Sequence, residues 1–333
     1  MIQLYPFLFS RLLYWHIKAG IKHKMTEPFY ILFCESPLDP KQVDEDFKDQ
    51  FVAAKQHGFE TLLFNFEDLV SADRASVATK RIKPGNTLVN VIYRGWMLTP
   101  GQYLSLYNDL LSKNYKLINT VEQYRNCHYL PDSLTFIEGK TPRTVFQTFD
   151  GDRSIEQLIE KATLFGQAPV ILKDFVKSEK HHWETACFVK DASDTEQLRQ
   201  TIHRLLELRG NQLNEGLVIR EFIELNDLTH HSKSGMPLTE EYRLFFYNKK
   251  LVGIYDYWEE GEYKASKPDT KAFEEIARQI DSHFFSMDIA RQKNDKLIII
   301  ELGDGQVAGL PDKTDRNGFY KQLKTLCGNE VLR

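Results

Sequence analysis

Three segments near the C-terminal end decide the fold: FSMDIA at residues 285–290, the polar break KNDK at 293–296, and LIIIELGDG at 297–305. A leucine followed by three isoleucines predicts a strand covered on both faces, because an exposed strand would alternate apolar and polar residues. The Asn–Asp pair in the break is typical of a hairpin turn. Each strand of this hairpin would carry an acid, Asp288 in the first and Glu301 at the end of the second.

Carboxylates on two paired strands can converge, and Asp304 follows in the loop beyond them. Mg²⁺ takes oxygen ligands, keeps some of its waters and shares its remaining positions with phosphates. The pattern therefore predicts a magnesium site formed by Asp288, Glu301 and Asp304. The alternative is a single buried acid held by backbone donors, next to an ordinary turn aspartate.

Length and charge limit the remaining possibilities. A chain of 333 residues has room for two or three domains. Its net charge of −4 gives no general attraction to nucleic acid or to anionic membranes, so we expect neither as a partner. The cysteines Cys34, Cys127, Cys187 and Cys327 show no metal-binding spacing. We therefore expect reduced thiols in a cytoplasmic protein.

Residues 1–24 form an N-terminal extension of uncertain structure. The apolar run from Leu4 to Trp15 is interrupted by Arg11 and is too short to span a bilayer. It also lacks the basic leading region and the small-residue cleavage site of a signal peptide. The extension is either an amphipathic helix on a surface or the product of an upstream start, and the first domain is expected from Met25.

Residues 25–130 alternate strand and helix, which predicts a small and largely parallel sheet. No glycine fingerprint follows any of the strands, so dinucleotide binding is not expected. Arg94 ends a buried strand, where ligands gather in open α/β sheets, and is either an anion contact or an ordinary exposed arginine. The expected strands are 29–34, 61–64, 87–93 and 116–118, and the expected helices are 43–55 and 103–111.

Residues 131–210 begin with a loop-rich connector, and strands at 170–173 and 185–189 with helices at 155–164 and 196–208 are expected after it. Lys173 ends the first strand. A desolvated ammonium must be paired, so we expect an anion beside it. Lys177, Lys180 and the neighbouring histidines are either further anion contacts or a solvated loop.

Residues 211–333 are predicted to be α+β. The segment at 217–225 is expected to be a strand, and 241–246 alternates so that Arg243 lies among aromatic residues. A partly buried arginine either pairs with an internal acid or binds a phosphate. A helix at 272–280 precedes the acidic hairpin.

The order of these features resembles the ATP-grasp fold. It comprises a lysine-ended strand, a strand with the sequence Arg-Glu-Phe-Ile-Glu, a Glu-x-Arg strand and two successive acidic strands. The resemblance covers residues 165–310. It is to the clade named for an arginine-to-lysine replacement, which includes the cell-division-cycle assembly chaperone of translation initiation factor 2. It implies an α/β protein with a Rossmann-like preATP-grasp domain (25–130), an ATP-grasp small lobe with its connector (131–210), and an α+β large lobe with the metal site (211–333).

The resemblance also implies the cofactors ATP and Mg²⁺ and a role for each matching residue. Asp288 and Glu301 would bind the metal, with Asp304 nearby. Lys173 and Arg243 would act on the phosphates in catalysis. The nucleotide contacts would be Lys173, Lys177 and Arg243 at the phosphates, Glu221, Phe222 and Ile223 as the hinge over adenine, and Glu224 near the ribose.

Two departures from the family pattern bear on turnover. The loop at 174–183 contains no glycine, although a glycine-rich loop usually covers the phosphates. Gly303 stands where the usual metal motif has asparagine, so Asp304 or water would have to replace that ligand. Both changes weaken the expectation of efficient turnover more than that of ATP binding.

The resemblance implies an ATP- and Mg²⁺-dependent ligase that activates a carboxylate as an acyl phosphate for attack by an amine or thiol. The acyl donor and the nucleophile are small molecules or peptides. The alternatives are an ATP-binding, non-catalytic assembly protein with a protein partner, or a nucleotide site lost to drift. We rank the ligase first because the charged groups around the phosphates are all present. Arg94 and the loop with His230 and His231 are candidate substrate contacts.

Overall fold

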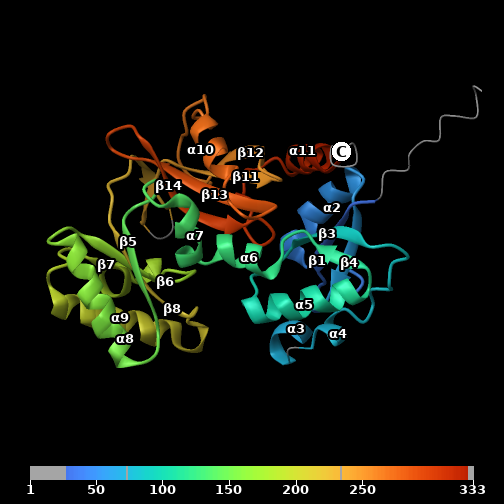
Figure 1. The fold of residues 1–333 in the computed structure, drawn as a ribbon. Helices are drawn as coiled ribbons and strands as arrows, with labels where there is room; N and C mark the ends of the chain where they lie inside the picture. The colour runs from blue at the N-terminus through green and yellow to red at the C-terminus, as the bar shows by residue number, and fades with distance from the viewer. Residues whose placement is uncertain (1–27, 73, 233–234, 329–333) are drawn as a thin grey trace, which may run out of the picture.

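The computed structural model describes residues 28–72, 74–232 and 235–328. They form three four-stranded sheets, one in each of three domains (Figure 1). The extension predicted for residues 1–24 lies outside the described residues. Within the described ranges, no helix combines the length and the apolar character needed to cross a bilayer.

The N-terminal sheet is parallel, with strand order β2-β1-β3-β4, as the βαβ pattern predicts. Residues of β1 alternate between two cores: Ile31 and Phe33 face α2, while Leu32 and Cys34 face the side of α3 to α5. Gly58, with φ +76°, ends α2 as expected of a C-cap glycine. The elements are β1 (Tyr30–Cys34), α2 (Lys48–Gln56), β2 (Glu60–Phe64), α3 (Phe66–Ala72), α4 (Ala75–Ala78), β3 (Val89–Arg94), α5 (Pro100–Ser112) and β4 (Tyr115–Leu117).

The small lobe is an antiparallel sheet of order β5-β8-β6-β7 with α8 and α9 on one face (Figure 1, green to yellow). Leu172 and Ile219 point to these helices. Lys173 and Val218, one residue along each strand and paired with each other, therefore point to the opposite face. The elements are β5 (Thr144–Thr148), α8 (Asp152–Ala162), β6 (Val170–Asp174), β7 (Phe188–Val189), α9 (Thr195–Arg209) and β8 (Gly216–Glu221).

The large lobe contains the acidic hairpin. Its antiparallel sheet has the order β12-β11-β13-β14, and β13 pairs with β14 as predicted. The sheet elements are β11 (Glu241–Tyr247), β12 (Lys250–Asp256), β13 (Phe284–Arg291) and β14 (Leu297–Asp304). The other elements are β9 (Asp227–His230), β10 (Pro237–Thr239), α10 (Lys271–Ala277) and α11 (Arg316–Gly328).

Three local predictions are wrong. The connector does not begin as a loop, because α7 (Leu130–Ile137), which follows α6 (Val121–His128), covers its start. Pro131 lies in the first turn of α7, where proline is tolerated. Residues 183–187 form a π-helical turn, so the strand expected at 185–189 is limited to β7. β8 belongs to the small-lobe sheet, which therefore extends past the boundary expected at residue 210.

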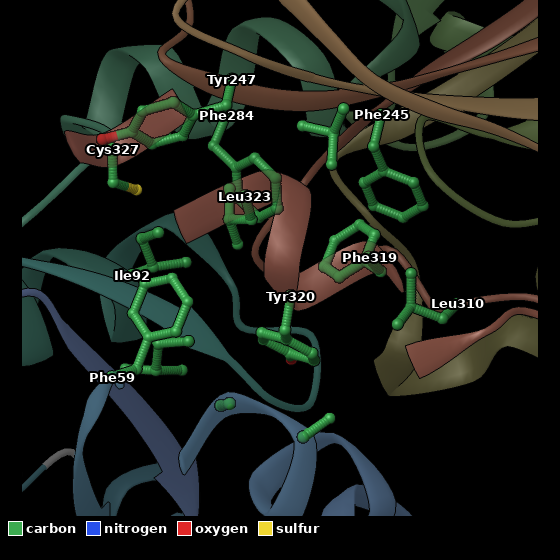
Figure 2. Close-up of a cluster of buried hydrophobic side chains, with 14 of the residues drawn as sticks. Phe59, Ile92, Phe245, Tyr247, Phe284, Leu310, Phe319, Tyr320, Leu323 and Cys327 are labelled. Atoms are coloured by element: carbon green, nitrogen blue, oxygen red, sulfur yellow. The ribbon is translucent and has the colours of Figure 1, made fainter. Parts of the chain in front are cut away.

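Helix α11 joins the N-terminal domain to the large lobe. Figure 2 shows Phe319, Tyr320 and Leu323 of this helix among aromatic and aliphatic side chains of both domains. Phe319 packs against Phe245 of β11 with ring centroids 5.3 Å apart, and Tyr320 packs against Phe59 beside β2 at 6.2 Å. The two domains therefore share one core, whereas the small lobe has a core of its own.

Candidate functional site

Three charged side chains form one row across the large-lobe sheet. Arg243 on β11 pairs in register with Asp288 on β13, which pairs with Glu301 on β14. Directly opposed residues of a sheet project to the same face, so the row is set by the strand pairing itself. Arg243 Nε and Nη2 each donate to one oxygen of Asp288 at 2.7 Å, a bidentate pair buried in the sheet face.

Lys173 meets this row from the small lobe. Its Nζ donates to Glu301 Oε2 at 3.0 Å, and the lysine side chain is 9 % exposed. The four charged groups line one cavity of about 90 Å³ between the lobes. The structure thus brings Lys173, Arg243, Asp288 and Glu301 together around a single gap.

The charges of these groups depend on one another. Burial tends to raise the pKa of Glu301, but Lys173 and Lys180 outweigh it and lower the pKa to about 2. Burial raises the pKa of Asp288 above its usual range, against the opposing effect of Arg243. For Arg243, burial acts to lower the pKa, yet the Asp288 carboxylate raises it overall. Each cation is thus held by one acid.

The two loop lysines differ in position. Lys177 is exposed, its backbone N–H donates to the Asp174 carboxylate, and its charge lowers the pKa of His128. Lys180 extends over the Trp258 ring, with Nζ 6.0 Å from the ring centroid, and its charge lowers the pKa of Glu301. The charge of Lys180, which the sequence leaves as one of several loop cations, therefore acts on a predicted metal ligand.

At the predicted hinge, the backbone donors of Glu221 and Phe222 are already used. Their N–H groups donate to the carbonyls of Arg143 and Pro169, both at 2.9 Å, so neither is free for an adenine edge. The Glu221 carboxylate forms a surface pair with Arg143. These two N–H groups are therefore engaged with the connector and with the segment before β6.

The third predicted hinge residue, Ile223, and the predicted ribose contact, Glu224, lie at or near the surface. Ile223 is half-buried, and Glu224 is exposed with its carbonyl accepting from Lys293 N–H. The sequence did not indicate an aromatic group beside them: Trp183 stacks on Phe188 at 5.4 Å, and Phe188 meets Phe222 edge-on at 5.3 Å. These rings form an aromatic cluster beside the predicted hinge.

Asp304 lines the cavity but has protein partners. It is fully buried and accepts hydrogen bonds from Asn119 Nδ2 at 2.6 Å and from the Gln306 backbone N–H at 2.9 Å. Burial raises its pKa to about 7. In the part of the chain that the structure describes, no three His, Cys, Asp or Glu side chains gather closely enough to hold a metal ion. The three predicted carboxylates therefore do not form one cluster.

Gly303, at the position expected for asparagine, faces Ser286 on β13. A Cβ on Gly303 would lie 2.6 Å from Ser286 Oγ, so the hydroxyl fills the space that a longer side chain would enter. Asp288 and Glu301 still offer adjacent hard oxygen donors, and Mg²⁺ commonly binds through one or two carboxylates with water and substrate phosphates. The residues present fit a magnesium ion held by these two acids.

Arg94 is neither exposed nor available to an anion, contrary to both expectations. It is 1 % exposed and donates to Gln50 Oε1 at 2.8 and 3.2 Å and to the carbonyls of Gly305 and Ala308, the latter at 2.8 Å. The next carbonyl in this loop, that of Gly309, accepts from Arg243 Nη1 at 2.9 Å. Arg94 thus fixes the loop that follows the metal-site strand.

Replacing Arg94 by methionine should lower the free energy of unfolding by about 3 kcal/mol, because two buried carbonyls would lose a charged donor. Urea denaturation followed by circular dichroism measures the change. The control is Arg278→Met, whose side chain is 64 % exposed and pairs with Glu275 on the surface. It should cost about 0.5 kcal/mol or less. Equal midpoints for the two variants would contradict the role of Arg94.

His230 and His231 do not line the cavity. His230 is exposed at the end of β9, and His231 Nε2 lies 3.8 Å from Glu260 Oε1. The cavity instead contains His128, at the end of α6, which the sequence analysis did not single out. A capping box of Thr120 and Gln123 starts α6, and this Thr-x-x-Gln pattern was the available signal for the helix.

Comparison with known proteins agrees with this geometry. Residues 164–323 match the model of an ATP-grasp domain family, family 3 of the arginine-to-lysine (R-to-K) clade. This part of the chain therefore matches an ATP-grasp domain of that clade, in agreement with the resemblance, and ATP and Mg²⁺ are the cofactors that the match supports. No curated protein matches the chain.

Solved structures share the fold over almost the whole chain. A RimK domain protein ATP-grasp from Sphaerobacter thermophilus superposes with a TM-score of 0.54 and 14 % identity, covering 89 % of this chain and 98 % of that one. D-cycloserine synthetase DcsG gives 0.54 and 13 %, covering 90 % and 99 %. The ATP-grasp ligase PsnB, complexed with minimal precursor, Mg and ADP, gives 0.52 and 12 %, covering 92 % and 98 %. At these identities the likeness establishes the fold.

Proposed function

We propose that this protein is an ATP- and Mg²⁺-dependent ligase that joins a carboxylate to an amine or thiol. The observation that carries the proposal is the convergence of two cations and two acids from facing sheets on one cavity. Lys173 and Arg243 have the charge and burial suited to a polyphosphate, while Asp288 and Glu301 suit the divalent cation that accompanies it. The fold shared with DcsG and PsnB accords with a ligase.

The chemistry has two steps. A carboxylate oxygen of the acid attacks the γ-phosphorus of ATP, the bond to the bridging oxygen breaks, and ADP leaves. The amine or thiol then attacks the acyl carbon, phosphate leaves, and the nucleophile's proton passes to solvent. Phosphoryl transfer depends on positioning and on neutralising the charge on the transferred group.

The chain's own residues would supply that neutralisation. Lys173 and Arg243 would donate to phosphate oxygens, which requires each to leave its present acid partner. Asp288 and Glu301 would then hold Mg²⁺, which when bound would supply positive charge to neutralise the phosphates. Glu221, Phe222, Ile223 and Glu224 are proposed to lie beside the nucleoside, and Lys177 and Lys180 beside the phosphates. Asp304 remains a predicted metal-site residue, engaged here with Asn119.

A second candidate function is an ATP-binding assembly protein without turnover. The loop between β6 and β7 favours it, because residues 174–183 contain no glycine whose N–H could approach the phosphates closely. In that case a protein partner would respond to ATP binding. A cytoplasmic location fits either function, since the four cysteines are buried residues of a kind that a reducing compartment keeps as thiols.

Release of ADP tests the ligase proposal. The protein would be incubated with Mg-ATP and mixtures of amino acids, other small carboxylic acids and short peptides, with ADP followed by a coupled assay. We expect stimulation over the rate without acid, and its loss in Lys173→Met. Tight binding of Mg-ATP without stimulation by any mixture, together with a stable protein partner, would favour the assembly protein instead.

A further inference from the structure

The cavity between the lobes continues beyond the charged groups to an apolar wall. Met97 follows β3 of the N-terminal domain, Leu130 begins α7, Phe175 follows β6, and Val307 follows β14. Leu130, Phe175 and Val307 are 4, 5 and 8 % exposed, while Met97 is 43 % exposed. Leu130, Phe175 and Val307 thus form buried walls of the pocket, and the exposed Met97 thioether lies at its entrance.

One polar side chain interrupts this wall. His128 lines the cavity, with its ring 5.0 Å from that of Tyr124. In the described part of the chain its imidazole has ring contacts but no hydrogen bond to a protein group. Burial, assisted by the charge of Lys177, lowers the pKa of His128 to about 4, so the ring is neutral at pH 7. A neutral imidazole offers one donor and one acceptor to a ligand.

The charges around the cavity restrict what else can bind there. Lys173 and Arg243 are each paired with an acid, and the triphosphate would take both cations when ATP enters. Among the residues that the structure describes, the lining has one further acid, Asp304, which already accepts hydrogen bonds from Asn119 and Gln306. A second charge on the ligand would therefore lose its hydration without gaining a partner, which is unfavourable.

We propose that this wall is the subsite of the acyl donor, and that it selects a small carboxylic acid whose remaining part is uncharged and apolar. The proposal rests on the ligase function. The reacting carboxylate would lie toward Lys173, the apolar part against Leu130 and Phe175, and His128 would hydrogen-bond a polar atom of the acid.

Hydroxylamine provides a test that does not need the natural nucleophile. It attacks the acyl carbon of an acyl phosphate, phosphate leaves, a proton passes to solvent, and the hydroxamate is measured as its coloured ferric complex. The full-length protein would receive Mg-ATP, hydroxylamine and one acid at a time. The panel is isobutyrate and benzoate against glutarate, glutamate and lysine. We expect the acids with uncharged side groups to have at least tenfold higher kcat/KM.

Two matched pairs of variants test which residues select the acid. Met97→Glu should raise the KM for the favoured acid at least tenfold without changing the KM for ATP, while Met97→Leu should stay within twofold. The side chain is exposed at the entrance, so the fold should tolerate both. His128→Phe should raise the same KM, and His128→Asn, which keeps a donor and an acceptor, should restore most of it.

The outcomes separate the two proposals. Hydroxamate from no acid, although Mg-ATP binds, would overturn the ligase function. Hydroxamate formed as well from glutarate or lysine as from isobutyrate would leave the ligase standing and overturn the apolar subsite. An unchanged KM for the acid in both Met97→Glu and His128→Phe would also overturn the subsite.

Discussion

Lys173→Met is expected to weaken ATP binding about 30-fold while leaving adenosine binding unchanged. A charge-assisted hydrogen bond to a phosphate contributes about 1.5–3 kcal/mol, which corresponds to roughly 10–100-fold in affinity. Methionine keeps most of the apolar stem of this side chain, which is 9 % exposed, so the packing of β6 should survive. Isothermal titration with a non-hydrolysable ATP analogue and with adenosine measures both affinities.

The control for this prediction lies in the same lobe. Lys190 is exposed after β7, and Lys190→Met should leave both affinities as in the parent. Equal losses for the ATP analogue and adenosine in Lys173→Met would place the lysine away from the phosphates.

Glu301→Gln should make ATP binding insensitive to magnesium. In the parent, Mg²⁺ and ATP are expected to depend on each other, because the phosphates take the cations from Asp288 and Glu301, and the metal compensates the two acids left behind. Removing one acid should reduce the magnesium-dependent gain in affinity at least tenfold. The measurement is the affinity of ATP with excess Mg²⁺ and with a chelator.

Asp288→Asn should have the same effect on magnesium and an additional effect on stability. It leaves the buried Arg243 without its counter-charge, which typically costs about 3–5 kcal/mol. Glu301, whose side chain is 35 % exposed, is therefore the cleaner test. The control is Glu275→Gln, at an exposed position on α10. An unchanged response to magnesium in both acidic-site variants would refute the assignment of the metal ligands.

The strands of the large-lobe site can be predicted from the sequence because the patterns that define them are local. The run from Leu297 to Ile300 defines a strand, and the preceding turn pattern sets the hairpin. A regular register would pair Asp288 with Ile300, and a shift between Asp288 and Ile289, which the sequence does not signal, brings Glu301 opposite Asp288 instead. Lys173 is recognisable for a similar reason, since a lysine at the end of a buried strand needs an anion.

The features that the sequence could not predict depend on contacts between segments that are distant along the chain. Arg94 is held by carbonyls more than 200 residues away, so no local pattern separates a buried arginine from an exposed one. The membership of β8 in the small-lobe sheet is likewise decided by pairing with β5 and β6, not by its neighbours in sequence. His128 enters the cavity only because α6 and α7 pack beside β14.

Helix α11 packs against both the first sheet and the last, and this restricts how the gene can change in evolution. Its residues Phe319 and Tyr320 fit side chains from both ends of the chain at once. A recombination event that exchanged the N-terminal domain alone would therefore bring in a surface with the wrong shape for this helix. The beginning and the end of the gene are expected to change together, while the small lobe, which has a separate core, is free to diverge at its own pace.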